Sequence, residues 1–327
     1  MVNDLVSVII PCYNGERFID RSIRSVYEQD YSDIELIVVN DGSTDRSEEK
    51  ITAWESLFSQ KGWKFRYIYQ ENQGLGGAIN TGLKYISGEY LTLLDADDRF
   101  LQGAISKKAA YLFQHPDAAA VRSNGWTVSG NSRWLFIQTD DEKNITDVFA
   151  ALLLGKTNNW AGSYLVRTEP LFKFYPDRSI YPSRFGQNLQ ILLPVVYHQK
   201  CGFIDEPLME YIKQEDSLSS VKSFDLALQK ALQNARGYWD IREHLIKCII
   251  TELPEQERWQ KQVYAEYCRN IIQIALEHKS KPLLQEYYAE LKKNAIPTLN
   301  DKISYYKLVC KPVSFCLRLV RKINAII

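Results

Sequence analysis

Short runs of β-branched and aromatic residues alternate with helix-like stretches from residue 5 to about residue 125. The runs cover residues 6–10, 36–39, 65–69, 90–94 and 119–121. Between the first two runs lies one apolar helical stripe, made of Phe18, Ile19, Ile23 and Val26. Strands that alternate with helices predict an α/β fold whose mainly parallel sheet is covered by helices on both faces.

The remainder of the chain is less regular and then becomes helical. Strands are expected at residues 134–137 and 163–166, and helices at 148–154 and at 187–198, the last interrupted by Pro194. From residue 223 the pattern is helical and charged, with breaks at Pro254 and near Pro297. We therefore predict a main domain over residues 5–220 and a helical region over residues 221–327.

Composition excludes several classes of protein. The chain of 327 residues carries 40 basic and 40 acidic side chains, so its net charge indicates no nucleic-acid partner. Its 6 cysteines form no CxxC pair, which favours a reducing cytoplasm over secretion. No signal peptide is recognisable, and no run reaches the roughly 20 apolar residues of a membrane span.

Two carboxylates directly follow the apolar run at residues 90–94. Ligands of open α/β sheets bind beyond the carboxyl ends of the strands, so Asp95 and Asp97 are expected at the edge of the sheet where ligands bind. Neighbouring carboxylates repel each other unless a cation lies beside them, and Mg²⁺ or Mn²⁺ held jointly with ligand phosphates satisfies this need. The alternative is that the two side chains only solvate a loop or cap the next helix.

Two further positions on this edge are suited to a nucleotide. Asp41 can accept the imide N–H of a uracil, and the ring of Tyr13 can stack on the base. Asn72, Gly74, Gly76 and Gly77 precede a helix expected at residues 78–86 and allow a phosphate to approach the backbone. Simple turns and a helix cap are the alternatives at both places.

Four ordered motifs together resemble the inverting family 2 glycosyltransferases. They are residues 8–14 (VIIPCYN), 38–45 (VVNDGSTD), 72–74 with 80–82 (NQG and NTG), and 94–98 (LDADD). The resemblance is strong to about residue 125 and weaker to about residue 220. It implies a GT-A fold with a C-terminal helical extension and a nucleotide-sugar donor that is most often a UDP-sugar. It also implies Mn²⁺ or Mg²⁺ as cofactor, and transfer with inversion of configuration at the anomeric carbon of the sugar.

The resemblance also assigns roles to individual residues. Asp97 is the principal metal ligand, with Asp95 beside the metal and the ribose. The remaining positions of the nucleotide site are Pro11, Tyr13, Glu16, Asp41, Asn72, Gly74 and Ala96. The implied acceptor is a glycan or a lipid-linked glycan of a bacterial surface polysaccharide.

The sequence departs from the family pattern at two places. Many members carry an arginine where this chain has Ile79, so a cationic contact to the donor is missing. Members also place a Glu-Asp pair, the source of the general base, where this chain has Gln187 and Asn188. An amide cannot remove a proton at neutral pH, so these two side chains are expected only to orient the acceptor.

Other acceptor-side residues are Glu215 and Asp216, which are alternative bases, and Trp160 with Asn158 and Asn159, which can hold a sugar. A solvated loop and a buried tryptophan are the alternatives. Residues 301–327 combine lysine and arginine with aromatic and aliphatic side chains, which suits peripheral contact with an anionic membrane surface. A helix that packs on the rest of the protein is equally consistent.

Two rival functions remain open at this point. A protein that binds nucleotide-sugar but has impaired catalysis would explain the amides at Gln187 and Asn188. A nucleotidyltransferase shares a related sheet and acidic site, but it usually has a basic, glycine-rich loop after the first strand, which residues 11–15 lack. The donor sugar, the acceptor linkage and the oligomeric state are left open.

Overall fold

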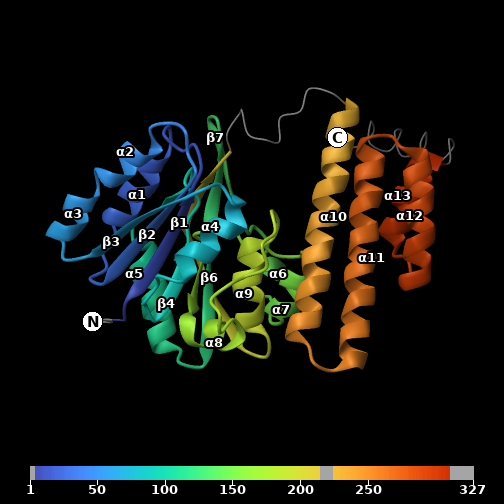
Figure 1. Ribbon diagram of the computed structural model, residues 1–327. Helices are drawn as coiled ribbons and strands as arrows, with labels where there is room; N and C mark the ends of the chain where they lie inside the picture. Colours follow the sequence, from blue (N-terminus) through green and yellow to red (C-terminus); the bar gives the residue numbers. More distant parts are fainter. Residues whose placement is uncertain (1–3, 214–223, 310–327) are drawn as a thin grey trace, which may run out of the picture. The chain divides into compact units, whose positions relative to one another are not determined.

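The computed structural model describes residues 4–213 and 224–309. The chain divides into two compact units, Met1–Ser217 and Leu218–Ile327. The first unit is an α/β structure and the second consists of helices in its described part (Figure 1). The predicted fold class is confirmed.

Nine strands of the described residues form one mixed sheet in the first unit. Its order is β3 (Lys64–Gln70), β2 (Ile34–Asp41), β1 (Val6–Cys12), β4 (Tyr90–Leu93), β8 (Tyr164–Arg167), β6 (Ala118–Ser129), β9 (Lys200–Ile212) and β5 (Arg99–Phe100), with β7 (Ser132–Leu135) paired to β6. The first four strands in this order are parallel, whereas β8 runs antiparallel to both neighbours. The carboxyl ends of β1 to β4 therefore meet at one edge.

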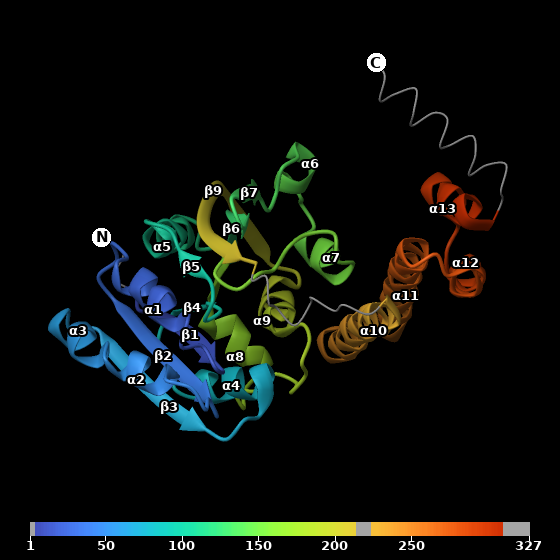
Figure 2. The same ribbon diagram turned by 90° about the horizontal axis from the view of Figure 1, so that it is seen from above.

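Burial on both faces explains the continuous apolar runs of the central strands. Every residue of β1, β2 and β4 is buried. Figure 2 shows α1 (Ile19–Tyr27), α3 (Glu55–Gln60) and α5 (Ala104–Gln114) on one face, and α4 (Gly74–Leu83), α8 (Thr168–Phe174) and α9 (Gln187–Val196) on the other. The short helices are α2 (Ser47–Thr52), α6 (Asp140–Lys143) and α7 (Val148–Leu153).

Each predicted strand overlaps an observed one, but the later part of the sheet differs from expectation, and the strand predicted at residues 134–137 is β7 at Ser132–Leu135. β6 continues to Ser129 instead of ending at residue 121, and β9 was not predicted as a strand. β6 carries several buried polar side chains, some of which are hydrogen-bonded by neighbouring segments. Asn124, for example, donates to the Ile137 carbonyl at 2.9 Å and accepts from the Ile137 N–H at 3.1 Å. Such buried polar positions interrupt the hydrophobic pattern that strand prediction uses.

The second unit is built from α10 (Phe224–Ile249), α11 (Leu253–Glu277), α12 (Lys281–Asn294) and α13 (Leu299–Val309). The expected break at Pro254 coincides with the first turn of α11, just after the end of α10, and Pro297 lies between α12 and α13. At the start of the predicted membrane-binding segment, Asp301 is buried and accepts from Arg269 Nε at 3.2 Å, so residues 301–309 pack within this unit. Residues 310–327 lie outside the described part. None of the described helices is long and apolar enough to cross a membrane.

A buried lysine links helix α5 to the loop that precedes β8. Lys108 is 1% exposed, and its ammonium donates to the Gly162 carbonyl at 2.6 Å. Burial without a carboxylate partner lowers the pKa of Lys108 to about 7. The folded protein therefore releases the Lys108 proton near neutral pH, well below the pH at which an exposed lysine does so.

We expect the stability difference between the wild-type protein and Lys108→Met to grow in favour of the wild type as the pH rises from 7 to 9. In this window the unfolded chain binds a proton at Lys108 that the folded chain has released. The free energy of unfolding of the wild type therefore rises with pH, whereas that of Lys108→Met does not change through this position. The expected change is about 1–3 kcal/mol, measured by urea denaturation. A difference that does not vary with pH would show that Lys108 keeps its proton when folded.

Candidate active site

The loops that follow β1 and β2 are joined by hydrogen bonds. Asn14, which adopts φ of 49°, donates its N–H to Ser43 Oγ at 2.9 Å and accepts from the Thr44 N–H at 2.9 Å. The Gly15 N–H donates to Ser47 Oγ at 2.8 Å. This shared frame leaves the Tyr13 side chain 56% exposed above the edge of the sheet, where its ring is open to a stacking partner.

Two other predicted nucleotide-site residues belong to the same frame. Pro11 lies within β1 opposite Val39 of β2 and is buried, so it can shape the floor of the site. The carboxylate of Glu16 accepts from the Arg46 N–H at 3.0 Å, next to the start of α2. One carboxylate oxygen of Glu16 therefore binds the backbone before α2 and helps to hold this loop.

Asp41 is held by two donors that prediction from the sequence missed. Its Oδ1 accepts from Gln70 Nε2 at 2.6 Å and from the Gln73 N–H at 2.8 Å, and the side chain is only 3% exposed. Gln70 is the register partner of Asp41 across β2 and β3. Both bonds fall on one oxygen, so Oδ2 receives no hydrogen bond from the described residues. The pairing register is the signal that could have identified Gln70.

The acidic cluster follows β4 as predicted. Burial and the charge of Asp97 raise the pKa of Asp95, and burial raises the pKa of Asp97. The main chain here is fastened to α1, because Arg21 Nη2 donates to the Asp97 carbonyl at 2.5 Å and Ser22 Oγ to the Asp95 carbonyl at 3.2 Å. Asp95 is thus exposed to the charge of Asp97 on a loop whose backbone is held by α1.

A third carboxylate, Asp98, is almost fully buried behind this pair. Its Oδ1 accepts from the Ile212 N–H at 2.9 Å, at the end of β9, and its Oδ2 is buried without a partner. Burial and the charges of Asp95 and Asp97 raise the pKa of Asp98. Asp98 therefore joins the acidic loop to the end of β9.

The donor set suits a hard divalent cation only if a ligand completes its shell. Nowhere in the described residues do three or more His, Cys, Asp or Glu side chains form a metal-binding group. Mg²⁺ and Mn²⁺ bind commonly through one or two carboxylates together with substrate phosphates, and Asp95 with Asp97 can supply such a pair. The unfavourable charge of the pair is the structural feature that such a cation would relieve.

The glycine-rich segment differs from prediction. Helix α4 begins at Gly74, so Gly74, Gly76 and Gly77 form its first turn instead of an approach to a helix at residues 78–86. Close packing explains two of these glycines. A Cβ at Gly76 would lie 2.9 Å from the Ser183 carbonyl oxygen, and one at Gly77 would lie 2.5 Å from Gln73 Cβ. Asn72 Oδ1 accepts from the Gly74 N–H at 3.2 Å.

The segment of residues 180–186, here called the strap, lies against α4 and α9. The Asn80 amide donates to the Ile180 carbonyl at 2.9 Å and accepts from the Ile180 N–H at 2.8 Å. The Gln190 amide makes the same reciprocal pair with Tyr181 at 3.1 and 2.9 Å. Ile79, at the position where many family members have arginine, is buried.

The two amides that replace the family's acidic pair have partners. Gln187 Nε2 donates to the Ser183 carbonyl of the strap at 2.7 Å. Asn188 Oδ1 accepts from the hydroxyl of Tyr164 at 2.8 Å, and the charge of Asp95 adds to burial in raising the pKa of Tyr164. The hydroxyl that bonds Asn188 is therefore near enough to the acidic cluster to be affected by the charge of Asp95. Glu215 and Asp216 lie outside the described residues.

Trp160 belongs to an aromatic group beside the end of β9. Its ring stacks on Tyr211, with centroids 5.3 Å apart and planes inclined by 16°, and meets the edge of Phe136 at 3.9 Å. The side-chain amide of Asn158 is buried without a hydrogen-bond partner. Tyr211 directly precedes Ile212, which is bonded to Asp98, so the group lies near the acidic cluster.

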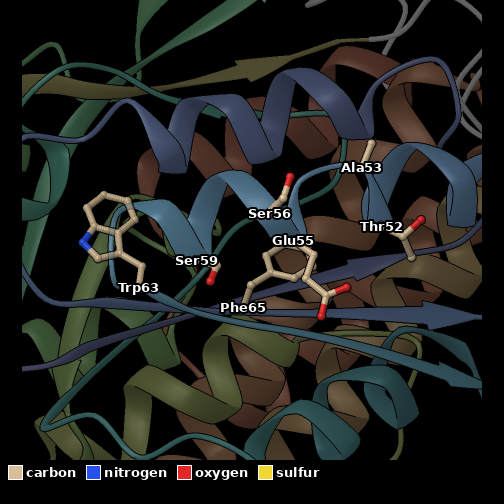
Figure 3. A pocket seen from close by; sticks show the side chains of 7 residues that line it. All are labelled: Thr52, Ala53, Glu55, Ser56, Ser59, Trp63 and Phe65. Atoms are coloured by element: carbon tan, nitrogen blue, oxygen red, sulfur yellow. The ribbon is translucent and has the colours of Figure 1, made fainter.

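A separate groove of about 590 Å³ lies between α3 and β3 (Figure 3). Its walls contain none of the predicted site residues and are formed by Thr52, Ala53, Glu55, Ser56, Ser59, Trp63 and Phe65. Trp63 precedes β3, whereas the site residues follow the strands. The groove is therefore distinct from the acidic edge.

The mainly parallel sheet, its antiparallel β8 and the acidic loop after β4 define a GT-A-type fold. Solved structures of this class superpose on almost the whole chain. TarS of S. aureus (residues 1–349, in complex with UDP-GlcNAc) aligns with a TM-score of 0.60 at 15% identity, covering 93% of this chain and 91% of TarS. A mannosyltransferase from Pyrobaculum calidifontis, in complex with GDP-Man and Mn²⁺, aligns with a TM-score of 0.57 at 15% identity, covering 99% and 81%.

The sequence model of glycosyl transferase family 2 matches residues 7–171, and the protein belongs to this family. An uncharacterized glycosyltransferase of Nostoc sp. is 34% identical over 52% of this chain and 53% of its own length. Glycosyltransferase GlyA of Streptococcus pneumoniae is 45% identical over 30% of this chain and 14% of its own length. This chain therefore spans about half or less of these curated relatives. Family membership removes the nucleotidyltransferase alternative.

The contact between the loop after β1 and the acidic loop gives a stability prediction. A Cβ at Gly15 would lie 2.7 Å from Cys12 Sγ and 3.8 Å from Ala96 Cβ. We expect Gly15→Ala to lower the free energy of unfolding by about 1–3 kcal/mol, as overpacking does. In a Cys12→Ala background the same change should cost clearly less, because the sulfur that it meets is gone.

Thermal or urea denaturation of the four proteins of this double-mutant cycle measures the coupling. Equal costs of Gly15→Ala in both backgrounds would show that Cys12 is not the obstacle.

Proposed function

We propose that the protein transfers a sugar with inversion from a nucleoside-diphosphate sugar, preferably a UDP-sugar, to a glycan or lipid-linked glycan, and that Mn²⁺ or Mg²⁺ is required. The observation that carries the proposal is the pair of partly buried carboxylates, Asp95 and Asp97, whose pKa values are raised, on the same edge as Tyr13 and Asp41. A nucleoside diphosphate with a divalent cation would make both interactions that this edge offers. Its base would stack on the exposed ring of Tyr13, and the cation would bind the carboxylates.

The base end of the proposed donor site rests on Tyr13 and Asp41. The exposed ring supplies a stacking face, and Asp41 Oδ2 is left to accept a ring N–H of the base. Uracil and guanine carry such an N–H, whereas cytosine and adenine do not. The complexes of TarS with UDP-GlcNAc and of the Pyrobaculum enzyme with GDP-Man agree with both choices. Asn72, Gly74, Pro11, Glu16 and Ala96 are proposed to complete this end.

The diphosphate end rests on the acidic loop. Asp97 is proposed as the main protein ligand of the metal, with Asp95 beside it. When bound, the cation neutralises the charge that develops on the departing diphosphate. The bonds from Arg21 and Ser22 to the loop backbone keep both carboxylates in place, so little reorganisation accompanies binding.

The acceptor is proposed to bind between the aromatic group around Trp160 and the start of α9. Sugars present apolar faces and hydroxyl groups, which match the stacked rings and the unpartnered amide of Asn158. The described cysteines, Cys12, Cys201, Cys248 and Cys268, are all free, which supports the proposal of a reducing, cytoplasmic location. Peripheral membrane contact through residues 310–327 is proposed from their composition.

A second candidate function is nucleotide-sugar binding without turnover. The observation in its favour is that Gln187 and Asn188 are amides whose hydrogen bonds go to Ser183 and Tyr164. An amide in either position cannot act as a general base. Under the preferred proposal the base is Glu215 or Asp216.

Calorimetric titration with UDP and with GDP, each with and without Mn²⁺, tests the donor site. We expect Mn²⁺-dependent binding with preference for UDP, and Asp97→Asn should weaken it at least about ten-fold because a charged ligand of the metal is lost. The matched control is Asp117→Asn, an exposed aspartate before β6 that pairs with Lys200. Absence of binding by either nucleotide would sink the proposal.

Release of UDP from a panel of UDP-sugars tests turnover. We expect the wild-type protein to be active, and Glu215→Gln or Asp216→Asn to lower kcat by about 10²–10⁴-fold, the usual contribution of a general base. Asn188→Asp and Gln187→Glu should bring no gain. If the wild type is inactive and one of these two carboxylates creates activity, the binding function is the correct one.

A further inference from the structure

The proposed donor brings negative charge to an edge that is already acidic. Two cations near the acidic loop are committed to protein groups. Arg21 donates to the Asp97 carbonyl at 2.5 Å, and Arg99 Nε pairs with Glu210 at 2.6 Å. A diphosphate bound beside Asp95 and Asp97 therefore needs positive charge from elsewhere in addition to a metal.

The strap of residues 180–186 connects the two ends of the proposed site. At one end, Ile180 is paired with Asn80 of α4, and the Ser183 backbone touches Gly76 in the first turn of the same helix. That turn directly follows Gln73, whose N–H holds Asp41. The first end of the strap thus lies beside the base-binding residues.

The other end of the strap leads into the acidic side. Gln187, the first residue of α9, donates to the Ser183 carbonyl at 2.7 Å. The next residue, Asn188, is bonded to Tyr164, which lies in the field of Asp95. In the proposed function, a diphosphate that joins a base near Asp41 to a metal near Asp97 would lie beside this strap.

Arg184 is the cation of the strap. It directly follows Ser183, its side chain is exposed, and it forms no ion pair or hydrogen bond with the described residues. Guanidinium groups bind phosphate oxygens through two parallel N–H donors, which an ammonium cannot do. We propose that Arg184 binds the diphosphate of the nucleotide-sugar donor. This inference rests on the proposed function, and it adds a residue that none of the four sequence motifs contains.

The test compares nucleotide binding by the wild type, Arg184→Gln and Arg184→Lys in calorimetry with Mn²⁺ present. UDP and UMP are titrated, and GDP with GMP if guanine nucleotides bind better. We expect Arg184→Gln to weaken diphosphate binding by about ten-fold or more and monophosphate binding by less, with Arg184→Lys between. The control is Lys84→Gln, which removes one exposed positive charge just after the far end of α4.

The outcomes separate this inference from the proposed function. If the wild type binds no nucleotide, the proposed function fails. If the wild type binds and Arg184→Gln binds diphosphate equally well, or loses mono- and diphosphate affinity in the same proportion, Arg184 does not contact the diphosphate. A change of the same size in Lys84→Gln would reduce the effect to general charge and overturn the assignment as well.

Discussion

The repulsion between Asp95 and Asp97 is the constraint on which the site depends. Both follow β4, a strand buried between β1 and β8, so the centre of the sheet fixes where their backbone lies. Burial keeps the pKa of Asp97 above its ordinary value, and the charge of Arg21, which is bonded to the backbone of the loop, lowers that pKa only in part. Charge that the fold leaves unbalanced is a reason for a ligand to bind there.

The other parts of the site are arranged around this loop by close packing and backbone hydrogen bonds. Gly15 brings the loop after β1 to Ala96, and the same loop is bonded to Ser43 and Ser47 beyond β2. A rigid frame of this kind fixes the distance between Tyr13 and the acidic pair before any ligand arrives. Preorganisation of this sort reduces the entropic cost of binding.

Much of the fold could be predicted from the sequence, because strands buried on both faces leave continuous apolar runs and loops at their ends carry polar motifs. The prediction failed where side chains satisfy one another over long separations. Buried polar residues such as Asn124 interrupt the apolar pattern, so the full length of β6 was not predicted. The glycine at position 76 is required by its close contact with Ser183, and a glycine-rich segment does not predict the start of a helix such as α4. Gln70 and Tyr164 acquire their relation to the site only through strand register and tertiary contact.

The strap is fixed by neutral groups. Asn80 and Gln190 each use a carboxamide as both donor and acceptor toward one residue's backbone, which imitates the pairing of two strands, and Gln187 adds a third amide bond. Amides neither titrate nor attract counterions. The geometry of the strap is therefore insensitive to acidity and to salt, whereas the carboxylates that it faces respond to both. Changes in pH or salt concentration are therefore expected to alter ligand affinity through the carboxylates, while the geometry of the strap stays the same.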